Sequence, residues 1–198
     1  MNYLRPILLG VIVLLAPFPS WAHSPIAGVG SFYNGLLHPV FVPAHMLLLL
    51  GVGIILGLHT PSRDKAAFAC FGLASVIGLI VTIYFSTNIE LVIYAVAGIT
   101  GGLILANINT PLWFKSVLLG VAGLLIGLDS RQDALTGQDK TLTLIGNAIS
   151  VNLLVLYAMV LANFLSKKNW QLLIGLRVAG SWISAISLLM FAFAITTK

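Results

Sequence analysis

Six long runs of apolar residues dominate the sequence and constrain its fold more than any other feature. Each run is close to the ~20 residues that an α-helix needs to cross about 30 Å of hydrocarbon. None alternates between apolar and polar residues, as the strands of a membrane β-barrel do. We therefore expect an all-α fold, a polytopic membrane bundle of six transmembrane helices. The runs are approximately Gly35–Leu58, Lys65–Phe85, Ile89–Ala106, Leu112–Leu128, Leu142–Leu165 and Trp170–Ile195.

The composition excludes a water-soluble globular protein. Of the 198 residues, 59% are hydrophobic and only 8% are charged, whereas about 25% of the residues in a typical soluble domain are charged. The lipid bilayer is therefore the expected partner of most of the chain. The net charge of +5 comes from ten Lys and Arg residues scattered singly or in pairs, so we expect no nucleic-acid partner. The single cysteine, Cys70, excludes an intramolecular disulfide and a CxxC motif.

The first 22 residues have the features of a secretory signal peptide. A short basic start precedes the apolar run Ile7–Ala16, and small residues stand at the −3 and −1 positions of a cleavage site after Ala22. Removal of this segment would leave residues 23–198 as a single transmembrane domain. His23 would then be the first residue, and its α-amine and imidazole together can chelate a transition metal. Alternatively, His23 only begins an exported tail.

The basic residues set the expected orientation in the membrane. Under the positive-inside rule, the connections that carry Lys and Arg lie in the cytoplasm, which places the mature N-terminus outside. The outer side is then mainly acidic, a useful asymmetry for a protein that gathers cations. The cytoplasmic set is Arg63, Lys65, Lys115, Lys167 and Lys168, and the outer acidic set is Glu90, Asp129, Asp133 and Asp139.

Histidines in the first third of the chain are the strongest candidates for chemistry. Asn34, His38 and His45 are four and seven residues apart, so they would project from one face of the first mature helix. Polar side chains in a span usually face a bundle interior or a cavity. The two histidines would lie about 10 Å apart on a straight helix, too far to bind one ion together, although Pro39 and Pro43 offer a kink. Either each histidine is one step on an ion path, or both only pack against neighbouring helices.

The first helix reads Gly-Leu-Leu-His-Pro from residue 35, and His45 follows. With the exported start, His23 and six further spans, this segment resembles the HupE/UreJ family of bacterial membrane proteins. The family pattern is His-Pro, two variable residues, Gly, one variable residue and Asp-His; here Val42 and Ala44 replace the Gly and the Asp. The resemblance implies a permease for nickel, sometimes cobalt, in the bacterial cytoplasmic membrane, associated with hydrogenase and urease gene clusters.

Two acidic residues complete the expected metal-binding set. Glu90 starts the third helix and Asp129 ends the fourth, so both should lie at the outer surface near His38. The substrate would be Ni²⁺ or Co²⁺, with no permanently bound cofactor. The metal candidates are His23, His38, His45, Glu90 and Asp129. Asn34, Asn147 and Asn152 would line the path, or their amides would hold helices together.

Enzymatic function is not expected. The sequence contains no GxSxG or HExxH motif. The intramembrane histidines share one helix, whereas bis-histidine haem ligation across a bundle needs ligands from two facing helices. A non-transporting accessory or scaffold protein that has lost the metal site remains the alternative, because Ala44 removes the carboxylate that would help to bind a divalent ion.

Overall fold

The helices follow the apolar runs of the sequence. The computed structural model describes residues 28–58, 64–83, 89–132 and 135–196, and in these residues all regular secondary structure is α-helical. The prediction of an all-α fold is therefore confirmed for this part of the chain. The helices are α2 (Ser31–Phe41), α3 (Pro43–Leu58), α4 (Lys65–Val81), α5 (Glu90–Ala106), α6 (Leu112–Asp129), α7 (Gly137–Lys168) and α8 (Trp170–Thr196).

Five of the six apolar runs form one helix each, and the first run forms two. The run expected at Gly35–Leu58 begins at Ser31 and is interrupted at Val42, so that α2 and α3 form a bent pair with an angle of 74°. Helix α7, which contains the fifth apolar run, begins before that run and has 32 residues. Its first turn is polar, so hydrophobicity alone did not mark where it starts.

The lengths of the helices support an integral membrane protein. Among the described helices, α6, α7 and α8 are long and apolar enough to cross a membrane, and the bent pair of α2 and α3 makes a fourth candidate if it is one span. Helices α4 and α5 are apolar but have 17 residues each, or about 25 Å of helix. The count of six spans stays a prediction. The expected signal peptide, residues 1–22, lies outside the described residues.

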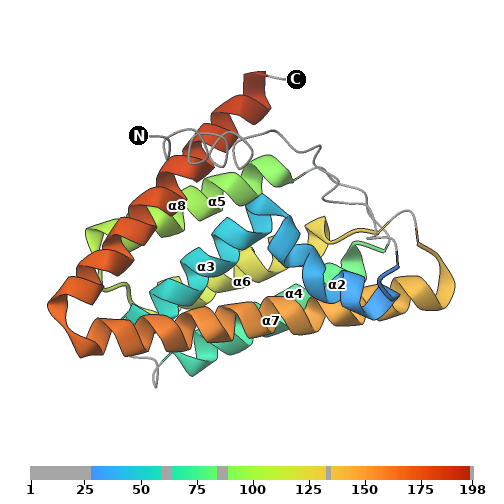
Figure 1. Cartoon of the computed structure of the whole chain (residues 1–198), viewed down its shortest axis with the longest axis horizontal. Helices are drawn as coiled ribbons and strands as arrows, with labels where there is room; N and C mark the ends of the chain where they lie inside the picture. Colours follow the sequence, from blue (N-terminus) through green and yellow to red (C-terminus); the bar gives the residue numbers. More distant parts are fainter. Residues whose placement is uncertain (1–27, 59–63, 84–88, 133–134, 197–198) are drawn as a thin grey trace, which may run out of the picture.

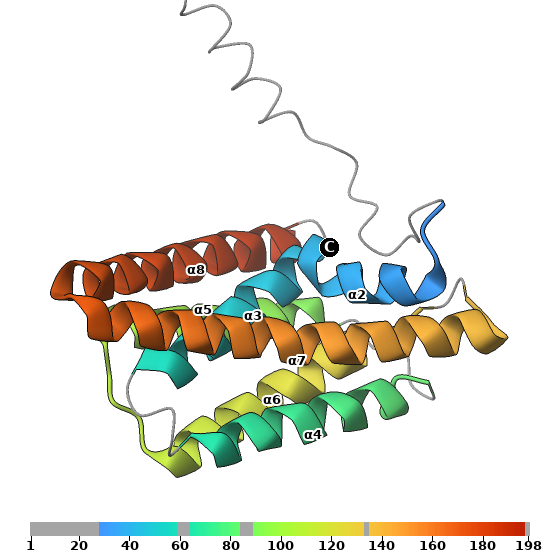
Figure 2. The same ribbon diagram turned by 60° about the horizontal axis from the view of Figure 1, so that its bottom comes forward.

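The helices pack around α3. In Figure 1, α7 and α8 form the two arms of a V and α3 lies between them. Helix α4 packs mainly on α6, α5 on α8, and both α2 and α3 on α7. Figure 2 shows the α4 and α6 pair together on one side of the molecule. Eleven of the 16 residues of α3 are buried, so α3 is the central helix, and any polar residue on it is enclosed by the bundle.

Glycines allow the paired helices to approach closely. A Cβ atom at Gly101 of α5 would overlap the backbone of Gly180 and Ser184 in α8, and one at Gly127 of α6 would overlap the backbone of α4. Such contacts between small residues stabilise helix pairs in membranes, where lipid provides no hydrophobic driving force. Not every glycine of these helices has this role, since a Cβ at Gly102 or Gly120 would meet no atom within 4 Å.

Adjacent glycines of α5 provide a matched test of this packing. Gly101→Ala should lower the thermal stability of the detergent-solubilised protein, because overpacking at a close helix contact costs about 1–3 kcal/mol. Gly102→Ala should leave stability unchanged or raise it by up to about 1 kcal/mol, the gain in helix propensity. Size-exclusion chromatography after a heating series measures both. Equal loss in the two variants would contradict this account of the contact between α5 and α8.

Candidate functional site

A break in the first apolar segment shapes the candidate site. Val42 lies between α2 and α3, and its backbone is extended, with φ −93° and ψ 108°. Pro43 accounts for this conformation, because a proline disfavours the helical region for the residue before it and has no N–H to donate. The kink offered by the two prolines is therefore present at Pro43, while Pro39 lies inside α2.

The break brings the two histidines together. His38 lies in the last turn of α2 and His45 in the first turn of α3, and their ring centroids are 5.5 Å apart with the ring planes at 78°. On a straight helix the same residues would be separated by about 10 Å along the axis. The expectation that Asn34, His38 and His45 share one face of one helix is therefore wrong, because Val42 ends the first helix between them.

Asp129 supplies a carboxylate to this site from another helix. It is the last residue of α6, and its Oδ2 lies 3.0 Å from Nε2 of His45. The His45 side chain is fully buried and that of Asp129 is 13% exposed. Because an ionised carboxylate only accepts hydrogen bonds, Nε2–H of His45 donates to Asp129. Asp129 was expected near His38, and the structure shows its carboxylate in contact with His45.

This hydrogen bond fixes which nitrogen of His45 is available to a ligand. In the neutral imidazole, a proton on Nε2 leaves Nδ1 with a free lone pair. Nδ1 of His45 is buried and has no hydrogen-bond partner among the described residues. A carboxylate on the far nitrogen also orients an imidazole ring, as it does in metal sites. The hydrogen bond therefore fixes the ring of His45 and leaves Nδ1 without a partner among the described residues.

His38 has a different polar neighbour. Nε2 of Gln132 lies 3.4 Å from Nδ1 of His38, and both side chains are buried, at 6% and 7% exposure. The amide nitrogen is a donor, so Nδ1 accepts this bond in the tautomer of His38 that carries its proton on Nε2. Gln132 follows the end of α6, so the same segment that carries Asp129 contacts both histidines.

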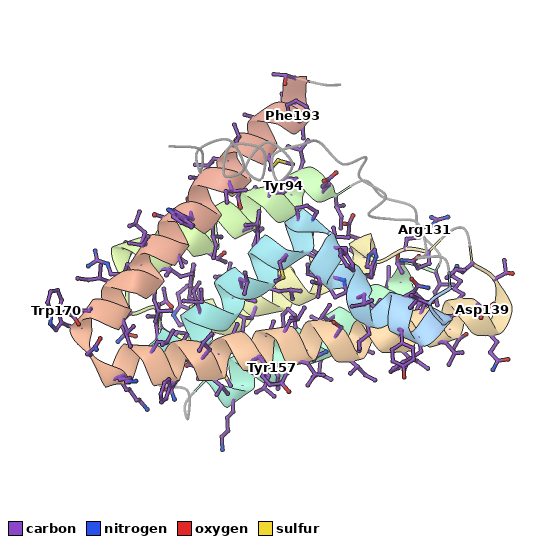
Figure 3. All side chains as sticks on the ribbon, viewed as in Figure 1. Tyr94, Arg131, Asp139, Tyr157, Trp170 and Phe193 are labelled. Atoms are coloured by element: carbon purple, nitrogen blue, oxygen red, sulfur yellow. The ribbon has the colours of Figure 1, made fainter. Side chains whose placement is uncertain are left out.

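Glu90 lies beside the histidine cluster rather than in it. It is an exposed residue at the start of α5, and its Oε1 accepts a hydrogen bond of 3.2 Å from the hydroxyl of Tyr94. Tyr94 is buried and within electrostatic reach of Asp129. Figure 3 labels Tyr94 near the start of α5. Glu90 is thus connected to the Asp129 region through one intervening side chain.

The described residues do not form a closed chelate. No three His, Cys, Asp or Glu side chains among them are grouped so that they could hold one metal ion together. His45 contacts both His38 and Asp129, whereas Glu90 contacts Tyr94. His23 lies outside the described residues.

The three asparagines expected to line a path have different surroundings. Asn34 donates a hydrogen bond of 2.7 Å to the carbonyl of Val29, just before α2. Asn152 donates to the carbonyl of Ala148 at 2.9 Å and lies 3.5 Å from Oγ of Ser75 in α4. The contacts of Asn152 therefore fit the alternative reading, in which the amide holds helices together.

Asn147 is the one of these three asparagines whose amide atoms both lack a partner within the described residues. It is 2% exposed, and neither atom of its amide has a hydrogen-bond partner among the described residues. On α7 it lies between Gly146, which packs on α2, and Val155, which packs near Gly53 of α3. These two contacts lie on either side of Asn147 along α7. A buried amide without partners is costly, and this distinguishes Asn147 from Asn34 and Asn152.

Comparison with known proteins gives the family. The family described as HupE / UreJ protein matches residues 11–190. The chain belongs to the HupE/UreJ family. This family is associated in general with nickel and cobalt transport and comprises transporters and accessory proteins, not known enzymes. No curated protein and no solved structure matches the sequence.

A carboxylate from α6 contacts the residue that follows the point where this HupE/UreJ protein departs from the pattern of its family. Ala44, which replaces the Asp of the pattern, is fully buried. Asp129 instead approaches the next residue, His45, from α6. The sequence predicted Asp129 as a site residue from its place at a helix end, but it did not predict Gln132 or Tyr94. The only signal in the sequence is that Gln132 follows Asp129 and Tyr94 follows Glu90 within one helical turn.

A buried ion pair lies at the other end of α3. Nζ of Lys115 in α6 is 2.6 Å from Oδ2 of Asp64, and both side chains are 3% exposed. Lys115 lines a small cavity together with Ile55 and Leu58, which belong to the last turn of α3. The sequence placed Lys115 on the cytoplasmic side as an orienting charge. The structure adds that this charge is buried and neutralised.

We predict that Asp64→Asn destabilises the protein by about 3–5 kcal/mol, because it leaves the ammonium of Lys115 buried without a carboxylate. The double variant Asp64→Asn, Lys115→Met should recover most of this loss, since a well-packed apolar side chain often replaces a buried ion pair at little cost. Thermal unfolding in detergent measures the difference. The exposed Asp139→Asn is the control and should change stability by less than about 0.5 kcal/mol. No recovery in the double variant would contradict the pairing.

Proposed function

We propose that this protein is a permease for Ni²⁺, or for Co²⁺, and that the ion moves along a path that includes His38 and His45. The observation that carries the proposal is the hydrogen bond between His45 and Asp129, with Nδ1 of His45 buried and without a partner among the described residues. The ion is the substrate, and the side chains of the chain supply its temporary ligands.

The chemistry of the donors supports this choice of substrate. Imidazole nitrogen suits Ni²⁺ and related divalent transition metals, whereas Mg²⁺ and Ca²⁺ prefer all-oxygen sites. The carboxylate of Asp129 adds a negative charge that offsets part of the cost of moving a dication out of water. A conducting path also needs sites that bind weakly enough to release the ion. The absence of a closed three-ligand group in the described residues is compatible with this need.

The other predicted site residues have proposed places along the path. His23 and Glu90 would collect the ion at the outer mouth, which the predicted orientation places outside the cytoplasmic membrane. His38, His45 and Asp129 would carry it inward, and Asn34, Asn147 and Asn152 would line the route. Of these amides, Asn147 has the strongest support, because it is buried and both atoms of its amide lack partners within the described residues.

Nickel uptake into proteoliposomes tests the proposal. We expect His45→Ala to abolish uptake, because it removes the buried nitrogen ligand. Asp129→Asn should reduce metal affinity by about 10–100-fold, the usual effect of removing a carboxylate that orients a ligating histidine. Uptake is measured with an indicator inside the vesicles over a range of Ni²⁺ and Co²⁺ concentrations.

Asp139→Asn is the matched control for charge. Asp139 is exposed in the first turn of α7 and accepts a hydrogen bond from Ser31, so its loss should leave uptake close to that of the parent protein. Size-exclusion profiles identify any variant that fails to fold. Parental uptake in folded His45→Ala and Asp129→Asn would exclude the proposed path.

A membrane accessory protein without transport is the second candidate. Two observations favour it: Ala44 replaces the family aspartate, and the described residues contain no group of three metal ligands. This candidate predicts that the parent protein moves neither Ni²⁺ nor Co²⁺ and co-purifies with a stable partner in fixed stoichiometry. Metal flux in the parent that depends on His45 would exclude it.

A further inference from the structure

Residues of α3, α7 and α8 line an apolar groove with a volume of about 490 Å³. Figure 1 shows α3 between the arms formed by α7 and α8. Its size is within the range of small-molecule sites in proteins. The groove contains none of the residues assigned to the metal path. Leu50, Ile54, Leu161, Leu165, Leu172 and Trp182 are among the residues that line it.

One end of the groove reaches the corner between α7 and α8. Leu165 and Leu172, which line the groove, lie on either side of the corner in the sequence. Lys167 and Lys168 occupy the last turn of α7 between them, and both are exposed. Trp170, the first residue of α8, is 69% exposed and is labelled at the corner in Figure 3. The groove is thus apolar along its length, and basic and aromatic side chains lie at the corner where it ends.

The positive charge of this corner is not balanced locally. Neither Lys167 nor Lys168 takes part in an ion pair within the described part of the chain, and the first turn of α8 has no acidic residue. Lys168 lies over the ring of Phe164, with Nζ 5.5 Å from the ring centroid. Basic clusters at the cytoplasmic end of membrane helices bind anionic head groups, and tryptophans favour the same interfacial level.

We propose that the groove binds an acyl chain of an anionic phospholipid, with its phosphate against Lys167 and Lys168. An occupant must be apolar along the groove and negative at the corner, and an anionic lipid has both properties in one molecule. A second copy of this chain fits less well. Two copies in the same orientation would have their lysine pairs at the same membrane level, where like charges repel.

Gly175 allows a direct test of whether the groove binds lipid. It lines the groove, and a Cβ there would meet no atom within 4 Å, so Gly175→Phe fills the space without a backbone clash. Gly120→Phe on α6 is the matched control, because Gly120 is equally open and lies outside the groove. For the head group, Lys167→Gln with Lys168→Gln removes the charge, and Lys140→Gln, near the other end of α7, is the control.

The experiment measures lipid binding to the full-length, delipidated protein in detergent by native mass spectrometry. Dioleoylphosphatidylglycerol is the anionic probe, and dioleoylphosphatidylcholine has the same chains with a neutral head group. We expect the parent, Gly120→Phe and Lys140→Gln to prefer the anionic lipid by about 25-fold, since each lysine near an anionic surface contributes a factor of about 5. Gly175→Phe should lose both lipids, and the double lysine variant should lose only the preference.

Three outcomes would overturn the proposal. Equal lipid binding by Gly175→Phe and Gly120→Phe would show that the groove is not the site. An unchanged preference in the double lysine variant would show that the corner does not bind the head group. A parent protein that is dimeric and free of lipid, and that becomes monomeric on Gly175→Phe, would assign the groove to a second copy.

Discussion

The backbone constraint imposed by Pro43 is the feature on which the candidate site depends. It makes Val42 extended and turns the chain by 74°, yet few backbone groups lose their partners. The N–H of Val42 donates to the carbonyl of His38 at 3.2 Å, and the N–H of Met46 donates to the carbonyl of Val42 at 3.0 Å. Broken helices are tolerated at membrane depth only where protein surrounds them, and Val42 is 3% exposed.

One long helix supports both sides of this break. Gly35 of α2 packs on the backbone of α7 at Thr143, and Gly53 and Gly57 of α3 pack on the same helix farther along. Because α7 has 32 residues, it can contact both parts of the bent segment, which holds their angle in place. The small residues matter because a side chain at these contacts would separate the backbones. The distance between the two histidine rings thus depends on helix packing as well as on the proline.

The sequence predicts the helices well because each follows from an apolar run of sufficient length. Pro39 and Pro43 together indicated a kink in the first run, and only the structure shows that it lies at Pro43. It could not predict that Asp129 contacts His45, because 84 residues separate them and only the packing of α6 against α3 joins them. The burial of Asp64 with Lys115 was missed for the same reason. Both residues lie next to polar connections, where charges are usually solvated, and hydropathy does not distinguish a solvated charge from a paired one.

The two ends of α3 differ in their electrostatics. His45 and Leu58 are separated by about 20 Å along the helix. Near His45, the carboxylate of Asp129 faces an imidazole. A neutral imidazole does not cancel the charge of the carboxylate. Near Leu58, Asp64 faces the ammonium of Lys115. Since charges interact strongly in a low-dielectric interior, a cation is attracted to the Asp129 end but meets a neutralised pair at the other. On the proposed path, a dication near His45 would therefore be held most strongly by the charge of Asp129, and neutral groups such as the amide of Asn147 would have to bind it beyond that point.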